Sequence, residues 1–308
     1  MQPLHKERQP FPVGPTRAVR PGTDIGECDA AFVVPVQRPA PLEPFIKWAG
    51  GKRHLAGRLI SLLPSQLGRY YEPFLGSGAV FFALRPEHAV LADSNQDLIQ
   101  CFQQVRDNVD DLIQALRELP NSQEAYYRIR ASIPTEPAAR AARTLYLVQL
   151  AFNGIYRVNS KTGLFNVPYG QHLGRVVLRE DRLRLASQAL QRARIVCDDF
   201  ETATQDATES DVVYLDPPYT VAHNSNGFVR YNQRLFSWED QLRLASSAED
   251  LVTRGCFVIV SNAYHHSIRE LYPSFKRTRI RRPSQMAADI ARRRSVYEYV
   301  LVGHYCDA

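Results

Sequence analysis

The tetrapeptide Asp216-Pro217-Pro218-Tyr219 constrains this chain more than any other segment, because it directly follows the apolar run 212–215. A short apolar run of this kind is typical of a buried strand, and two successive prolines can continue neither a strand nor a helix. The chain must therefore turn here, with a carboxylate, rigid carbonyls and an aromatic ring at the C-terminal end of a strand. In open α/β sheets, ligands bind at that edge.

This corner is rich in hydrogen-bond acceptors and carries one flat ring. An ionised Asp216 can only accept hydrogen bonds, and the backbone carbonyl of Pro217 is a further acceptor. An exocyclic amine suits this set, because it donates two N–H hydrogens and its nitrogen then gains lone-pair character. Tyr219 offers a ring on which a base can stack. The alternative is structural, with Asp216 capping the next turn and Tyr219 in the core.

The order of the predicted elements indicates an α/β fold. Strand-like segments at 70–72 and 89–92 each lead into a helix, the first from Ala79 and the second from about Gln96. This alternation is typical of a parallel sheet. Further buried strands are predicted at 195–197, 212–215, 256–260 and 296–302.

Two other stretches are predicted to be helical. The segment 101–194 contains helical patterns at 110–119 and 138–150 and a polar loop from Asn153 to Tyr169, so we expect a mostly helical insertion. Later, Ser237 with Asp240 three residues on is typical of a helix start, and Gly255 of its end. The apolar face of this helix is predicted to comprise Leu242, Ala245, Ala248 and Val252.

Composition favours an anionic partner. The net charge is +6, and basic residues are concentrated between 276 and 294. A phosphate-tracking patch is one interpretation of that segment, and a solvated basic face is the other. Residues 1–44 hold nine of the 20 prolines, and we expect them to form a disordered tail outside the fold.

The cysteines and the apolar runs indicate the cellular compartment in which the protein is expected. Five cysteines without a C-x-x-C spacing are typical of free thiols in a reducing cytosol, and Cys197 and Cys256 are predicted to be buried. The histidines show no ligand spacing, so no metal site is expected. No apolar stretch reaches 18 residues, so we expect a cytoplasmic protein without a membrane helix.

Seven stretches, in this order, resemble the Dam-like D12 class of DNA adenine-N6 methyltransferases. They are FIKWAGGK (45–52), YEPFLGSG (71–78), LADSN (91–95), FNGIYR (152–157), FNVPYG (165–170), DPPY (216–219) and VIVSN (258–262). The resemblance spans about residues 45–305. It implies a Rossmann-like sheet that binds S-adenosylmethionine, with residues 45–100 as its cofactor-binding half and 195–308 as its catalytic half. Residues 101–194 would then be an inserted target-recognition domain.

The resemblance also implies functional residues. Trp48, Lys52, Asp93 and Asp216 match cofactor contacts of the family, and Gly76 and Gly78 match its glycine-rich loop. From the residues themselves, two glycines permit a tight strand-to-helix turn, and an acid after the next strand can accept from ribose hydroxyls. Asp93 as a helix N-cap is the alternative. Asp198 or Asp199 is expected near the cofactor adenine. The catalytic residues would be Asp216, Pro217, Pro218 and Tyr219.

The polar loop of the insertion is the candidate reader of DNA sequence. Tyr156, Arg157, Asn159 and Lys161 offer base-edge donors and acceptors and one ring for stacking. Arg157 touching only phosphate is the alternative. The best-known relatives read GATC, but the loop 159–165 differs chemically from theirs, so GATC or another site is expected. A target adenine in a duplex must be flipped out. A restriction endonuclease that acts on the same site is a candidate partner.

Three other functions remain open at this point. Cytosine-N4 methylation is one, although Ser is usual at the position of Asp216 in such enzymes. Methylation of RNA adenine or of a protein glutamine is the second, and Asn is typical of the glutamine enzymes. A DNA-binding relative without catalysis is the third, against which the intact set of Trp48, Lys52, Asp93, Asp216 and Tyr219 argues.

Overall fold

The computed structural model describes residues 40–159, 161–171, 178–220, 236–283 and 295–304. Positions 1–39 of the predicted tail lie outside these ranges. Residues 40–44 contact the folded unit, since the N–H of Leu42 donates to the carbonyl of Phe82 at 2.9 Å and Pro44 is buried. The predicted boundary at Phe45 is therefore corrected to about residue 40.

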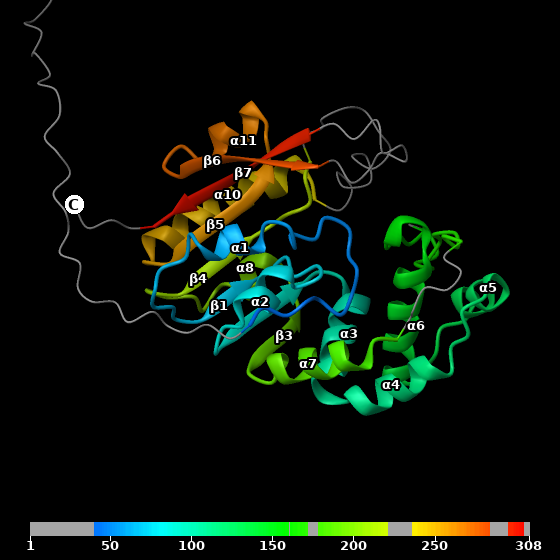
Figure 1. Cartoon of the computed structure of the whole chain (residues 1–308). Helices are drawn as coiled ribbons and strands as arrows, with labels where there is room; N and C mark the ends of the chain where they lie inside the picture. The colour runs from blue at the N-terminus through cyan, green and yellow to red at the C-terminus, as the bar shows by residue number, and fades with distance from the viewer. Residues whose placement is uncertain (1–39, 160, 172–177, 221–235, 284–294, 305–308) are drawn as a thin grey trace, which may run out of the picture. The chain divides into compact units, whose positions relative to one another are not determined.

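Seven strands form one sheet in the order β3-β2-β1-β4-β5-β7-β6 (Figure 1). The neighbours from β3 to β5 pair in parallel, whereas β7 pairs antiparallel with β5 and with β6. The Rossmann-like α/β fold class is confirmed, with one end of the sheet extended by the antiparallel strand β7 and by β6, which runs in the same direction as the parallel strands. The strands are β1 (Tyr70–Glu72), β2 (Ala89–Asp93), β3 (Ala193–Cys197), β4 (Val212–Leu215), β5 (Phe257–Ala263), β6 (Lys276–Pro283) and β7 (Ser295–Gly303).

Helices cover both faces of this sheet (Figure 1). The described helices are α1 (Ala56–Ile60), α2 (Ala79–Leu84), α3 (Gln96–Asp107), α4 (Val109–Arg117), α5 (Gln123–Ala131), α6 (Pro137–Leu150), α7 (Glu180–Leu190), α8 (Phe200–Ala203), α10 (Trp238–Thr253) and α11 (His266–Leu271), with the 3-10 turn η1 (Phe152–Gly154). None of these described helices is long and apolar enough to cross a membrane.

Strand β4 shows how the two apolar cores arise. All four of its residues are buried. Because side chains alternate along a strand, Val212 and Tyr214 join the core under α1–α7, while Val213 and Leu215 join the core under α8, α10 and α11. A strand buried on both faces has a continuous apolar run, which is why the sequence predicts β4 correctly.

Strand β6 was outside the sequence prediction, because its arginines hide the apolar pattern. It is the last strand of the sheet, so one of its edges has no strand neighbour. Ile280 is buried, whereas Arg279 and Arg281 are exposed, as expected where one face of an antiparallel strand meets solvent. Residues 284–294 of the predicted basic segment lie outside the described ranges.

The helices between β2 and β3 belong to two groups. Helix α3 contacts β2 and β3 and so lies against the sheet, and α7 contacts α3. Helices α4, α5 and α6 extend away from the sheet beyond α3 and α7 (Figure 1). The prediction of a mostly helical segment here is confirmed, and its role as a target-recognition domain stays a proposal.

Helix α10 confirms one prediction and corrects another. Ser237 and Asp240 form the predicted reciprocal capping box, and Gly255 follows the C-terminus with φ of 83°. The predicted apolar face is partly wrong, because Leu242 is 47% exposed. The buried residues are Gln241, Leu244, Ala245, Ala248 and Leu251. Because Gln241 is polar, the buried stripe to which it belongs was not recognisable from the sequence.

Of the two cysteines predicted to be buried, only Cys256 is. Its thiol donates to the carbonyl of Thr208 at 3.1 Å. Cys197 is exposed, so that prediction is wrong. It is the last residue of β3, which is the other outermost strand of the sheet and leaves one flank uncovered.

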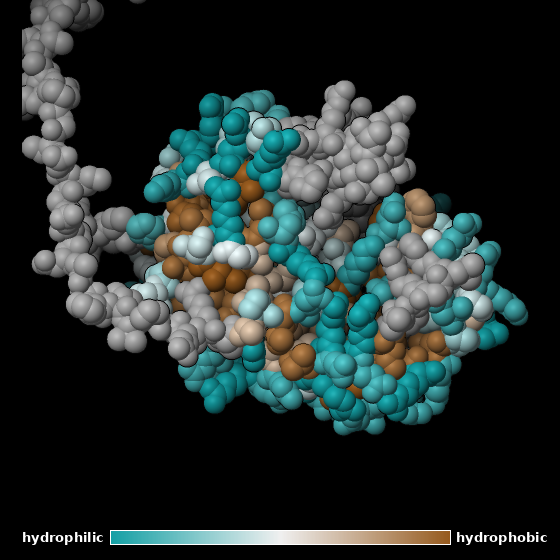
Figure 2. Space-filling model, viewed as in Figure 1, coloured by the Kyte–Doolittle hydropathy of each residue, from teal (hydrophilic) through white to brown (hydrophobic). Residues whose placement is uncertain are grey.

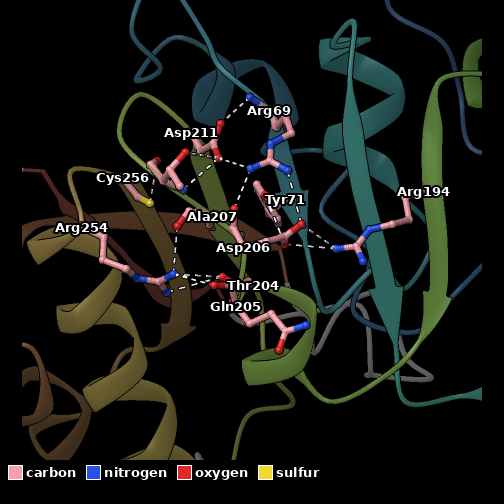
Figure 3. A network of polar contacts seen from close by, with 11 residues as sticks. Arg69, Tyr71, Arg194, Thr204, Gln205, Asp206, Ala207, Asp211, Arg254 and Cys256 are labelled. Carbon is pink, nitrogen blue, oxygen red and sulfur yellow. Dashed lines mark hydrogen bonds and ion pairs between the residues drawn. The ribbon is translucent and has the colours of Figure 1, made fainter.

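Ion pairs join the amino-terminal ends of the parallel strands (Figure 3). Asp211, just before β4, accepts from the backbone N–H of Arg69 at 2.7 Å and from its guanidinium at 3.2 Å. Asp206 accepts from Arg69 at 3.3 Å and from Arg194 at 3.2 Å. The charges of this edge are paired with one another, so the network is structural and a substrate site must be sought elsewhere.

The corrected face of α10 predicts unequal costs for the same substitution. Leu244→Ala should lower the free energy of unfolding by roughly 2–5 kcal/mol, because Leu244 is fully buried. Leu242→Ala, on the same helix, should change it by less than about 1 kcal/mol. Equilibrium denaturation in urea measures both values. Equal losses would contradict the assignment of the buried face.

Candidate active site

The carboxyl ends of β1, β2, β4 and β5 meet at one edge of the sheet, because parallel strands share a direction. Of the predicted residues, Asp93 is the last residue of β2, Asp216 directly follows β4, and Gly76 lies in the short loop after β1. The structure therefore gathers, at the edge opposite the ion-pair network, residues that lie up to 140 positions apart in the sequence.

Asp216 is held by Lys52. The lysine Nζ donates to the two carboxylate oxygens at 2.6 and 2.8 Å and to the carbonyl of Gly50 at 3.3 Å. The two side chains are only 7% and 15% exposed. Removing one partner of such a pair leaves an uncompensated buried charge, at a cost of roughly 3–5 kcal/mol. Lys52 thereby compensates the charge of the Asp216 carboxylate, and a charged carboxylate is an acceptor only.

Tyr219 is fixed at both of its ends. Its hydroxyl donates to Glu298 Oε2 on β7 at 2.9 Å, and its ring centroid lies 4.9 Å from Lys52 Nζ. Glu298 is buried, and its other oxygen lies 3.9 Å from His54 Nε2. Burial, together with the charges of Asp216 and Glu298, raises the pKa of Tyr219 well above its ordinary value. The ring is thus neutral and held in one orientation.

The proline turn is fixed from the side of α10. Gln241, fully buried, donates its side-chain amide to the Pro218 carbonyl at 3.3 Å. Asn262 on β5 donates in turn to Gln241 Oε1 at 2.9 Å. The carbonyl of Pro218 is therefore committed to the fold, which leaves that of Pro217 as the candidate acceptor for a substrate. Sequence reasoning missed Gln241, Asn262 and Glu298, since a single polar residue in an apolar stripe carries no recognisable spacing.

A second buried carboxyl group lies beneath the site. Glu72, at the end of β1, accepts from the Tyr70 hydroxyl at 2.9 Å and from the N–H of Phe81 at 3.1 Å. Burial raises its pKa to about 8, opposed by these two hydrogen bonds and supported by the charge of Asp216. Glu72 is therefore a mainly neutral acid at pH 7, whereas Asp216 carries the charge that Lys52 compensates.

The glycine-rich loop joins β1 to α2. Gly76 and Gly78 have φ of 50° and 66°, which favours glycine, and a Cβ at Gly76 would approach the Trp48 ring to 3.3 Å. Asp93 accepts from the N–H of Gly76 at 3.0 Å and from that of Asn95 at 3.0 Å. Asn95, which accepts from Leu98, is the N-cap of α3, so the N-cap alternative for Asp93 is wrong.

Tyr156 lies beside Trp48. The two rings stack with their centroids 5.0 Å apart at 26°, and the Tyr156 hydroxyl donates to Asp97 at 2.7 Å. Asp97 is also paired with Arg140 at 3.1 Å. These contacts commit one ring face and the hydroxyl of Tyr156, which the sequence predicts to be a DNA contact. The ring thus packs against Trp48, and the DNA contact of Tyr156 stays a prediction.

The other three predicted DNA contacts lie on an exposed hairpin. Arg157 Nε donates to Asn166 at 2.8 Å across the two strands of this hairpin, which pair at the bridge between Val158 and Phe165. At the tip, Asn159 Oδ1 accepts from the N–H of Lys161 at 2.8 Å and closes a turn. Arg157, Asn159 and Lys161 are all exposed, and Asn159 has a structural task besides any contact with DNA.

The two candidate acids after β3 differ in their contacts. Asp199 is the N-cap of α8, accepting from Glu201, and it is paired with Arg243 at 3.0 Å. Asp198 accepts from the N–H of Asp199 at 3.2 Å. Of the two, Asp198 is thus the less committed and the better candidate for a ligand.

Comparison with known proteins agrees with this site. A model of the D12 class of N6 adenine-specific DNA methyltransferases matches residues 48–286. The chain belongs to this family. The Type II methyltransferase M1.LlaDCHI of Lactococcus lactis subsp. cremoris is 36% identical over 273 residues, which cover 85% of this chain and 96% of the relative. The DNA adenine methylase of Haemophilus influenzae is 35% identical over 249 residues, covering 78% and 86%.

A third relative comes from another organism. The Type II methyltransferase M.MjaIII of Methanocaldococcus jannaschii is 32% identical over 289 residues, covering 85% of this chain and 99% of the relative. The chain is therefore a DNA adenine-N6 methyltransferase of the D12 class, and all of the residues of the edge described above except Glu298 lie within the matched range.

The buried acid of this D12-class enzyme predicts a pH-dependent stability. Because the pKa of Glu72 is raised to about 8 from 4.5, the folded state binds its proton more tightly than the unfolded chain, and stability falls as pH rises through that interval. Glu72→Gln cannot ionise. Relative to wild type, its free energy of unfolding should therefore increase between pH 5 and pH 8 by more than about 1.4 kcal/mol, the equivalent of one pKa unit.

Denaturant unfolding at the two pH values measures this difference. Glu118→Gln, at an exposed site on the end of α4, is the matched control and should show the same offset from wild type at both pH values. A Glu72→Gln offset that is equally independent of pH would contradict the raised pKa.

Proposed function

We propose that Asp216 and the Pro217 carbonyl bind the N6 amine of a flipped-out adenine while S-adenosylmethionine serves as the methyl donor. The observation that carries this proposal is the Asp216 corner, an ionised acceptor held within 2.6–2.8 Å of Lys52 at the carboxyl end of β4. Each carboxylate oxygen has two lone pairs, so an amine can be bound beside the ammonium group.

The residues of the edge fit the proposed cofactor. Its ribose hydroxyls need an acceptor, and Asp93 is a carboxylate at the end of β2 with acceptor capacity beyond its two backbone bonds. Its carboxylate needs a cation and N–H donors, which Lys52 and the loop of Gly76 and Gly78 supply. The Trp48 ring, on which Tyr156 stacks, offers a flat surface against which the cofactor can pack. When bound, this cofactor supplies the methyl group on an electrophilic sulfonium.

The protein then contributes positioning and electrostatics. Asp216 and Pro217 accept the two N–H hydrogens and so turn the nitrogen lone pair away from the ring and toward the methyl group. Tyr219, whose orientation is fixed by Glu298, stacks on the base. Asp216 would not need to be a strong base, because the amine nitrogen becomes acidic once the N–C bond has formed and the bond from the methyl group to sulfur has broken, and its proton can then pass to water. Holding reactants in line in this way accounts for much of the rate in such sites.

DNA contacts are proposed for the exposed hairpin. Arg157, Asn159 and Lys161 lie on it, and a flipped base costs a few kcal/mol that contacts of this kind offset. The helical segment 101–194, of which the hairpin is part, would be the target-recognition domain. The names of two relatives as Type II methyltransferases favour a restriction endonuclease of the same specificity as a partner.

The direct experiment transfers labelled methyl from S-adenosylmethionine into unmethylated duplex DNA, with RNA as the competing substrate, followed by nucleoside analysis. N6-methyladenine in the DNA is the expected product. N4-methylcytosine, or label in RNA alone, would refute the proposed use of the corner.

Asp216→Asn should reduce the rate of transfer by at least about 100-fold, because an amide nitrogen cannot accept from the amine. Affinity for the cofactor, measured by calorimetry, should change less than the rate does. Asp111→Ala, at an exposed position on α4, controls for loss of one negative charge and should retain wild-type turnover. Unchanged turnover of Asp216→Asn would remove Asp216 from the mechanism.

A further inference from the structure

Arginines and tyrosines form a cluster where β5, β6 and β7 lie side by side. The guanidinium of Arg279 lies 4.6 Å from the ring centroid of Tyr297 and 5.7 Å from that of Tyr264. Tyr264 also packs on Tyr299, with centroids 4.7 Å apart. Arg279 and Tyr297 are exposed, so the cluster faces solvent.

Strand register places this cluster at the same edge as Asp216. Tyr264 directly follows β5, which runs parallel to β4, and the pair Arg281↔Tyr297 lies near that end of β6 and β7. The exposed, hydrophilic side chains over β6, β7 and α11 are visible in Figure 2. Since strands are about 4.8 Å apart, three spacings separate β4 from β6, roughly 14 Å. That distance equals about four base-pair rises of duplex DNA.

The cluster and the catalytic corner share one strand. Tyr297 and Tyr299 flank Glu298 on β7, and neighbouring side chains of a strand point to opposite faces. Glu298 holds Tyr219 on one face, while on the other face Tyr297 lies against Arg279 and Tyr299 packs on Tyr264. A ligand bound on the face of β7 that carries Tyr297 would therefore lie beside the site at which the base is proposed to bind.

Two other arginines that lie over aromatic rings are paired with acids, whereas Arg279 is paired with none in the described part of the chain. Arg69 and Arg243 also lie over aromatic rings, but Arg69 is paired with Asp211 and Arg243 with Glu201, Asp199 and Asp240. Within the described part of the chain, no carboxylate is within ion-pair distance of Arg279. An exposed guanidinium that two rings orient, with no acid beside it, suits a phosphate ligand.

We propose that Arg279, oriented by Tyr264 and Tyr297, binds a backbone phosphate of the duplex that flanks the target adenine, and that Arg281 extends this contact along β6. The proposal rests on the proposed function, because it takes duplex DNA as the substrate. It separates this surface, on β6 and β7, from the hairpin, which is part of the helical segment 101–194 and is proposed to contact bases.

The test compares the salt dependence of DNA binding in Arg279→Ala and Arg279→Ala/Arg281→Ala with wild type. Each lost phosphate contact lowers the slope of log affinity against log salt by about 0.9. When salt is raised from 50 to 200 mM, the affinity of a variant for DNA should therefore fall about 3.5-fold less than that of wild type for each phosphate contact that the variant has lost. The rate at saturating DNA should be unchanged, and Tyr297→Phe, which keeps the ring, should bind as wild type does.

Arg192→Ala is the matched control. Arg192 precedes β3 at the opposite edge, is 65% exposed and is paired with Glu87, so its loss removes one positive charge away from the proposed surface. A slope for Arg279→Ala equal to that of Arg192→Ala would overturn this inference alone, provided that wild type methylates DNA. A different result would separate the two proposals. If the slope is smaller in Arg279→Ala than in wild type, but wild type transfers no methyl group, the proposed function is overturned and the DNA-binding surface is retained.

Discussion

A buried ion pair between Lys52 and Asp216 is the interaction on which the site depends. It joins a segment before α1 to the end of β4 and keeps a carboxylate charged where solvent barely reaches. Without the lysine, that carboxylate would have to lose its charge or its burial. The neighbouring acid Glu72 shows the outcome without a cation, since burial raises its pKa to about 8. Two carboxyl groups at one sheet edge thus have different charge states, and only Asp216 is set to accept from an amine.

The two edges of the sheet have different roles: the edge at the amino ends of the strands stabilises the fold, and the edge at the carboxyl ends is the proposed site of the chemistry. At the amino ends of the strands, Arg69, Asp206 and Asp211 satisfy one another and link the loops (Figure 3). At the carboxyl ends, Asp93, Asp216 and Tyr219 are held by hydrogen bonds at the edge that is proposed to bind the substrate. The antiparallel strand β7 contributes to this second edge through Glu298, so the strand that distinguishes this sheet from a wholly parallel one also orients Tyr219.

The sequence predicts those parts whose signal is local. Strand β4 and its proline turn, the capping box at Ser237 and the glycine loop depend on neighbouring residues, and the structure confirms the elements that they define. Contacts between distant segments are different. Glu298 lies 79 positions from Tyr219, and nothing around Glu298 in the sequence indicates that β7 inserts between β5 and β6. The stacking of Tyr156 on Trp48 is likewise a contact between distant segments, which becomes visible only when they pack.

The central claim is that Lys52 and Asp216 stabilise each other as a pair, and a double-mutant cycle on the free energy of unfolding tests it most directly. Lys52→Met and Asp216→Asn should each cost roughly 3 kcal/mol, because each leaves a buried charge without its partner. The double variant should cost less than the sum of the two by more than about 1 kcal/mol. Additive losses, within about 0.5 kcal/mol, would contradict the claim.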